Sequence, residues 1–182
     1  ETALGPVKLV KYGLLAGQRA LAGHAHQEAL THFQRALAAR QSGHPDDQLA
    51  DIWYGLGAAQ TALLLLDDAV ANLTRSFDYY VANGNIARAV AVAEHPLPAY
   101  AGQLKSATEL AARALELVPA DSYEAGRILS NYGRLLGFQE ADYAGATQAF
   151  ERAVAIARRE KDSAMEMRAL ANAAMVDVYH LR

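Results

Sequence analysis

The amino-acid sequence predicts an all-α fold, a solenoid built from paired helices. Three observations support this prediction. A helical pattern of small and large residues recurs four times, the recurrences are almost evenly spaced, and turn residues fall between them. A helix-period motif at near-constant spacing is typical of helical solenoids, in which each repeat covers an apolar face that its neighbour leaves bare.

The repeated motif is an Ala, a large residue four positions later, and a small residue three positions further on. Its copies begin 40, 38 and 39 residues apart. Residues three or four positions apart share one face of a helix, so each copy forms one stripe. The copies are Ala29-Phe33-Ala36, Ala69-Leu73-Ser76, Ala107-Ala111-Ala114, in which the large residue is replaced by Ala, and Ala146-Phe150-Ala153.

A second helical pattern precedes the motif by about twelve residues and carries a small residue. The clearest copy is Trp53, Leu56 and Gly57; Gly17 and Gly133 hold the matching place in the first and fourth repeats. A Gly at a helix crossing lets two helix axes approach closely, and the large residue of the motif fills the groove beside it. We therefore expect the helices to pair through contacts between small and large residues.

Nine helices are expected, and turn residues mark several of their ends. Gly43 and Pro45 end the second helix, Gly84 ends the fourth, and Pro119 ends the sixth, after which Ser122 caps the seventh. The expected ranges are 6–22, 25–41, 47–64, 67–83, 85–95, 103–118, 122–139, 143–160 and 162–180.

The third repeat is irregular, because its first helix runs into His95-Pro96-Leu97-Pro98. Two prolines remove two backbone donors and clash with the preceding turn, so the helix must end near Glu94 or kink. Two interpretations remain open. The break is harmless in a tolerant repeat, or it deforms the groove and opens a ligand pocket or a hinge.

Composition narrows the class of protein. The chain of 182 residues is 52% apolar, has a net charge of −3 and contains no cysteine. Disulfides and thiolate chemistry are therefore excluded, and nothing in the charge favours nucleic acid or an anionic membrane. We find neither a transmembrane stretch nor a signal-peptide layout and expect a cytoplasmic protein. Because the chain starts at Glu1, we expect residues 1–182 to be a single domain taken from a longer polypeptide.

No pattern of catalytic or metal-binding residues stands out. The six histidines are scattered over turns and helix surfaces, and the pairs Asp46-Asp47 and Asp67-Asp68 stand where helices begin and carboxylates cap free amides. A Ser-His-Asp order, a phosphate-binding loop and an EF-hand spacing are all missing from the sequence. We therefore expect no enzyme activity, no metal and no cofactor.

The repeats resemble the tetratricopeptide consensus. The resemblance rests on Trp53-x-x-Leu56-Gly57 followed by Ala69-x-x-x-Leu73-x-x-Ser76, and on Gly133 followed by Ala146-x-x-x-Phe150-x-x-Ala153. It implies a right-handed α-solenoid of antiparallel helix pairs, with about four and a half repeats over most of the chain. Repeats longer than 34 residues that are rich in Ala and Arg are also similar to the sensor segment of large ATP-binding, LuxR-type bacterial regulators related to the maltose-responsive activator.

In tetratricopeptide arrays the first helices of successive repeats line a concave groove that binds a partner. Arg suits carboxylates and phosphates, and Tyr suits apolar contact. The resemblance implies an acidic or amphipathic peptide, or a small polar effector, as the ligand. The groove positions carried over are Lys11, Gln18, Tyr54, Arg127, Arg134, Arg168 and Asn172.

The function expected from this resemblance is a protein-binding scaffold that serves as the sensor or regulatory arm of a transcriptional regulator. An alternative is a general adaptor unrelated to transcription. Another alternative is self-association as a homodimer through the last helix, because apolar residues at its end have no following helix to cover them. These residues are Leu170, Met175, Val176 and Val178.

Overall fold

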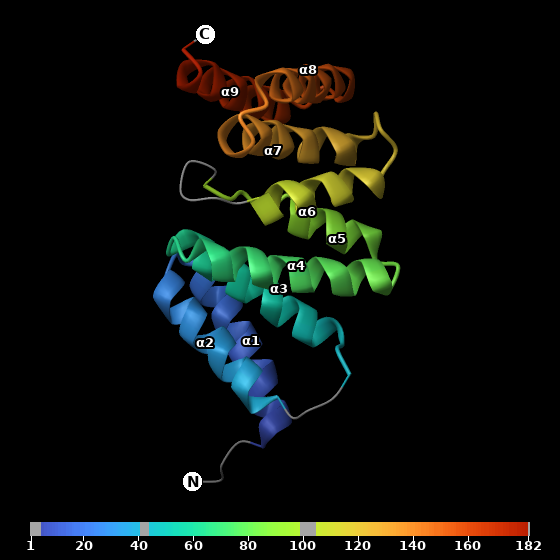
Figure 1. The fold of residues 1–182 in the computed structure, drawn as a ribbon. Helices are drawn as coiled ribbons and strands as arrows, with labels where there is room; N and C mark the ends of the chain where they lie inside the picture. Colours follow the sequence, from blue (N-terminus) through green and yellow to red (C-terminus); the bar gives the residue numbers. More distant parts are fainter. Residues whose placement is uncertain (1–4, 41–43, 99–104, 182) are drawn as a thin grey trace. The chain divides into compact units, whose positions relative to one another are not determined.

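The structure is a computed structural model that describes residues 5–40, 44–98 and 105–181 (Figure 1). Its regular elements in these ranges are nine α-helices, with no strand, so the predicted all-α fold is confirmed. No helix in the described ranges is long and apolar enough to cross a bilayer. The helices are α1 (Pro6–Ala22), α2 (His26–Ala39), α3 (Asp47–Ala62), α4 (Leu66–Ala82), α5 (Ile86–Ala93), α6 (Lys105–Glu116), α7 (Tyr123–Gln139), α8 (Tyr143–Glu160) and α9 (Ser163–Tyr179).

Local signals account for the helix ends. The Asp46 carboxylate accepts a hydrogen bond from the Leu49 amide at 2.9 Å, and the Ser122 hydroxyl accepts one from the Ala125 amide at 3.1 Å, so both caps are confirmed. Helix α5 ends at Ala93, two residues earlier than expected, because prolines follow. The predicted start of α6 at residue 103 lies outside the described residues.

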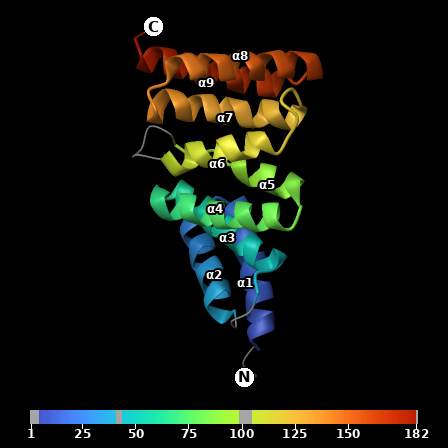
Figure 2. The same cartoon turned by 45° about the vertical axis from the view of Figure 1, so that its right-hand side comes forward.

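The chain divides into two compact units, residues 1–92 and 93–182, and each is described by itself. In the first unit α1 packs on α2 and α3, and α3 packs on α2 and α4. In the second unit α7 packs on α6, α8 and α9, and α8 also packs on α9 (Figure 2). The prediction of a single domain over residues 1–182 stays a prediction.

Contacts between glycines and large side chains join the helices of the first unit. Phe33 of α2 is fully buried and lies against Gly17 of α1 and Gly55 of α3. A Cβ atom on Gly17 would lie 2.7 Å from the Phe33 ring, and one on Gly55 would lie 2.3 Å from it. Gly57 of α3 meets Leu73 of α4 in the same way, at 2.7 Å. The expected pairing of small with large residues is confirmed in this unit.

The second unit repeats this arrangement. A Cβ atom on Gly133 of α7 would lie 2.8 Å from the Phe150 ring of α8, and one on Gly137 would lie 2.6 Å from Val176 of α9. Val176 is 1% exposed. The expectation that Val176 belongs to an exposed end was therefore wrong, because its side chain fills the space that Gly137 leaves.

A polar cluster also links three helices of the first unit. The Tyr80 hydroxyl of α4 donates to Asp51 Oδ1 of α3 at 2.6 Å, and Arg88 of α5 pairs with the same carboxylate. Arg88 also donates to the Tyr80 oxygen at 2.8 Å. Burial, together with the bond to Asp51, raises the pKa of Tyr80 to about 12. The hydroxyl therefore remains protonated and continues to donate to Asp51.

Replacement of Gly55 by Ala tests the close contact with Phe33. An Ala usually stabilises a helix by about 1 kcal/mol relative to Gly. Here the added methyl group would overlap the buried Phe33 ring, so we expect a net loss of about 1–3 kcal/mol in the free energy of unfolding. Urea denaturation measures this loss. Gly5→Ala, where nothing lies within 4 Å of the new Cβ atom, is the control and should change little. Stabilisation by Gly55→Ala would contradict the packing.

Candidate functional site

The candidate site lies on the adjacent helices α7 and α9 of the second unit. Arg127 and Arg134 come from α7, and Arg168 and Asn172 come from α9. The Asn172 amide donates to the Ser130 hydroxyl at 3.0 Å, and Ser130 stands between the two α7 arginines in the sequence. Residues at these spacings share a helix face. The structure therefore brings four of the seven predicted groove residues into one neighbourhood.

Arg127 forms an ion pair with Glu94, the residue after α5. The Arg127 side chain is 45% exposed and the Glu94 side chain only 12%. Burial raises the pKa of the Glu94 carboxyl, while the charges of Arg127 and Arg168 lower it. Glu94 Oε1 is buried and accepts no hydrogen bond from any described residue. The carboxylate thus depends on the two guanidinium groups for its stabilisation.

Arg134 has a different environment from Arg127. Arg134 is only 8% exposed. Its guanidinium donates hydrogen bonds to the Leu97 carbonyl and to Asn131 Oδ1, the latter at 2.7 Å. Leu97 lies between the two prolines of the irregular third repeat and is itself buried. Arg134 therefore holds the segment that follows α5 in place, and little of its side chain is accessible to a ligand.

Arg168 is a second exposed cation of the site. It is exposed, and it forms no hydrogen bond or ion pair with another described residue. Its charge still acts on its neighbours, since it contributes to lowering the pKa of both Glu94 and Asp162. A guanidinium with these properties can donate two parallel hydrogen bonds to a carboxylate or phosphate of a ligand.

Tyr123 supplies an aromatic surface next to these charges. The Arg127 guanidinium lies over its ring at 5.9 Å from the centroid, and the Tyr123 hydroxyl donates to Asp162 at 2.8 Å. Asp162 also caps α9 by accepting from the Met165 amide at 2.9 Å. The start of α9 is thereby tied to the start of α7, which keeps Arg127 and Arg168 on neighbouring turns.

The other three predicted groove residues belong to the first unit. Lys11 and Gln18 are exposed on α1, and Tyr54 is half-buried on α3, which packs against α1. They lie on a different unit from the four residues of α7 and α9. The prediction that all seven line one continuous groove stays a prediction.

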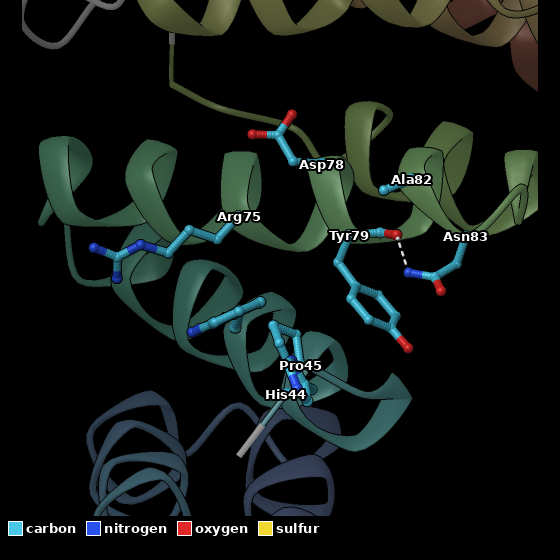
Figure 3. Close-up of a pocket in the computed structure, with 8 residues that line it drawn as sticks. His44, Pro45, Arg75, Asp78, Tyr79, Ala82 and Asn83 are labelled. Carbon is cyan, nitrogen blue, oxygen red and sulfur yellow. Dashed lines mark hydrogen bonds between the residues drawn. The ribbon is translucent and has the colours of Figure 1, made fainter. Parts of the chain in front are cut away.

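A hollow of about 490 Å³ on the first unit was missed by sequence reasoning (Figure 3). The sequence pattern marks Trp53 only as a packing residue, and it does not show that the loop with His44 and Pro45 lies beside Tyr79 of α4. Tyr79 Oη donates to Asp47 at 2.9 Å, and the Asn83 amide donates to the Tyr79 carbonyl at 2.8 Å. The lining residues are His44, Pro45, Trp53, Arg75, Asp78, Tyr79, Ala82 and Asn83.

Titratable groups at the irregular repeat were also missed. Burial lowers the pKa of His95 to about 4, so this histidine is neutral at pH 7. In the sequence, only the position of His95 beside Pro96 marks this residue. Its lowered pKa could not be predicted, because the burial of the imidazole depends on the tertiary packing. Among the described residues, no three His, Asp or Glu side chains come close enough to hold a metal ion.

Comparison with known proteins does not assign the chain to a class. No family model matches the sequence. No curated protein matches it either. The fold and the site therefore define the chain only as an all-helical protein with an arginine-rich face around one buried carboxylate.

The buried His95 makes stability depend on pH. Its pKa in the folded protein, about 4, is below the ordinary value of 6.5, so the unfolded chain binds the proton more readily. The contribution of the neutral, buried imidazole to the free energy of unfolding is intact above pH 6.5. It is lost as the pH falls towards 4, and the loss is at most about 3 kcal/mol. We expect His95→Gln to lose less stability over this range than the parent chain in urea denaturation. Glu94 is present in both proteins, so the difference isolates His95. Parallel pH profiles would contradict the assignment.

Proposed function

We propose that the chain is a tetratricopeptide-like helical-repeat module that binds an acidic or amphipathic peptide, or a small polar effector, on the face formed by α7 and α9. The observation that carries this proposal is a pair of exposed guanidinium groups on adjacent helices. Arg127 and Arg168 are both exposed beside Glu94, which alone is paired with Arg127. An anionic ligand group could pair with these guanidinium groups.

The polar groups of this face suggest how a ligand would be held. Arg168 offers a bidentate donor for a carboxylate, and Arg127 is available when the ligand competes with Glu94. The exposed edge of Tyr123 supports apolar contact, since this residue is 38% exposed. Arg134 acts indirectly, because its bond to the Leu97 carbonyl holds the segment that carries Glu94 and His95. Binding, rather than catalysis, is what this arrangement favours.

The wider role proposed for the module is the sensor or regulatory arm of a LuxR-type bacterial transcriptional regulator that acts in the cytoplasm. This step rests on the sequence resemblance of the repeats. Sequencing the parent gene on both sides of the chain tests it. A phosphate-binding loop upstream and a helix-turn-helix downstream would support the regulator, whereas an unrelated enzyme or further repeats would leave a general adaptor.

Charge reversal at Arg168 tests the binding face. We expect Arg168→Glu to weaken binding of an acidic amphipathic peptide, selected from a peptide array, by about 10- to 100-fold, because a charge-assisted bond is replaced by repulsion. Isothermal titration calorimetry at two salt concentrations measures this effect. Arg35→Glu reverses an exposed charge on α2 and is the matched control. Equal affinities for Arg168→Glu and the parent chain would contradict the proposed site.

A further inference from the structure

The hollow on the first unit is framed by two aromatic side chains from neighbouring helices. Trp53 comes from α3 and Tyr79 from α4, and both are half-buried. Pro45, from the segment before α3, forms another part of the wall. We call the hollow of Figure 3 the aromatic hollow. Its volume of about 490 Å³ lies in the range of cavities that hold small molecules.

Hydrogen bonds hold the walls of the aromatic hollow in place. The Tyr79 hydroxyl donates to Asp47 Oδ1 at 2.9 Å, and the Tyr79 ring points towards Pro45 in Figure 3. Arg40 fastens the segment that carries Pro45, because its guanidinium donates to the His44 carbonyl at 3.2 Å. A cavity whose walls are fixed loses little affinity to the ordering of side chains on binding.

The second unit contains the equivalent position and shows how the chain fills it there. Asp46 caps α3 and Ser122 caps α7. Gly57 of α3 and Gly133 of α7 each receive the large side chain of the next helix. The same number of residues separates the members of both pairs, so α3 and α7 can be compared position by position. The repeated motif aligns α4 with α8 in the same way.

The two aromatic residues have small, fully packed counterparts in the second unit. Leu129 of α7 holds the place of Trp53 and is 1% exposed, and Ile156 of α8 holds the place of Tyr79 and is 3% exposed. The chain therefore keeps aromatic surface accessible in the first unit at a place that the same helix pairing closes in the second.

One reason for this difference is a small residue at the end of α4. The matching residue of α8 is Arg159, whose guanidinium donates to the Asp121 carbonyl at 2.6 Å and so bridges α8 to the segment before α7. Ala82 holds this place in α4 and lines the aromatic hollow. Because an Ala has no such side chain, the space that the arginine takes in the second unit remains open.

A second reason concerns Arg75 of α4, which matches Arg152 of α8. Arg152 donates to the Ala120 carbonyl at 2.9 Å. The matching carbonyl of the first unit belongs to His44, and it accepts from Arg40 instead. Arg75 lines the aromatic hollow, is exposed, and forms one hydrogen bond within the described residues, through Nη1 at 3.3 Å. Its remaining guanidinium donors are thus available to a ligand.

The carboxylates near the aromatic hollow are engaged or point elsewhere. Asp47 accepts from the Tyr79 hydroxyl, and Asp46 pairs with Arg40 at 2.8 Å. Asp78 lines the hollow, but its carboxylate points away from the Tyr79 ring in Figure 3. A cationic ligand would therefore find no free carboxylate beside the aromatic rings.

We propose that the aromatic hollow binds a small organic carboxylate that carries an apolar ring. The ring lies against Trp53 and Tyr79, and the carboxylate accepts hydrogen bonds from the Arg75 guanidinium. The indole N–H of Trp53 forms no hydrogen bond with another described residue and offers a further donor. This site goes beyond the proposed binding face of α7 and α9, because it lies on the first unit and does not use Arg127 or Arg168.

Trp53 reports on its own site, because it is the only tryptophan in the sequence. Titration of the full chain with phenylpropionate, followed by tryptophan fluorescence, should give a saturable change with a dissociation constant of about 1 mM. Phenylpropanol, which has the ring without the charge, should bind about tenfold more weakly. Phenylpropylamine should bind more weakly still, because Arg75 repels its ammonium group.

Removal of the Arg75 charge tests the anion contact. Arg75→Gln should weaken the binding of phenylpropionate about tenfold, because the charge-assisted hydrogen bonds are lost. Arg35→Gln is the matched control, since Arg35 is exposed and holds the same place in the motif of α2. It should bind like the parent chain.

Filling the space tests where the ring lies. Ala82→Arg introduces the arginine that the second unit carries at this place, so it should leave the circular dichroism spectrum unchanged and weaken binding at least tenfold. Ala71→Arg adds the same charge at an exposed position of α4 outside the lining of the hollow, and it should bind like the parent chain.

The proposal is overturned when phenylpropionate gives no saturable change up to about 10 mM. It is also overturned when phenylpropanol or phenylpropylamine binds as tightly as phenylpropionate, or when Arg75→Gln or Ala82→Arg binds like the parent chain. Arg168→Glu should titrate like the parent chain. Loss of the signal in this variant would mean that phenylpropionate acts through the face of α7 and α9, which would support that face and contradict the aromatic hollow.

Discussion

The contact between a glycine on one helix and a large side chain on the next is the interaction on which both units depend. Phe33 shows why, because its ring is buried between Gly17 and Gly55 and so joins α1, α2 and α3 at one point. A methyl group on either glycine would require the helices to separate, and the dispersion contacts around the ring would be lost. The same kind of contact joins α7 to α8 through Gly133 and Phe150, and the contact between Gly137 and Val176 places α7, with its arginines, next to α9.

Much of the fold follows from the sequence because these contacts are encoded locally. The spacing of Ala, Phe and Gly predicted nine helices, and turn residues such as Ser122 predicted where they begin. Val176 was misplaced because a periodic pattern does not show which side of a helix its neighbour covers. Burial of Val176 depends on the space left by Gly137, which comes from a helix that is distant in the sequence.

The candidate site was predicted only in part, for a related reason. The repeat register places Arg127, Arg134, Arg168 and Asn172 on α7 and α9, but it treats the three arginines as equivalent. The structure distinguishes them through the irregular third repeat. Because two prolines end α5, the Leu97 carbonyl lacks a helical partner and accepts a hydrogen bond from the Arg134 guanidinium. Glu94 forms its ion pair with Arg127. Arg168 is left accessible, and no local pattern could have shown this.

A double-mutant cycle between Gly17 and Phe33 tests the central claim most directly. Gly17→Ala alone would push its new Cβ atom against Phe33 ring atoms at 2.7 Å, whereas Phe33→Val removes those atoms. We expect Gly17→Ala to destabilise the parent chain but to be neutral or stabilising in the Phe33→Val background, with a coupling energy of about 1–3 kcal/mol. Effects on the free energy of unfolding that add to within about 0.5 kcal/mol would contradict the claim that this contact determines how the helices pack.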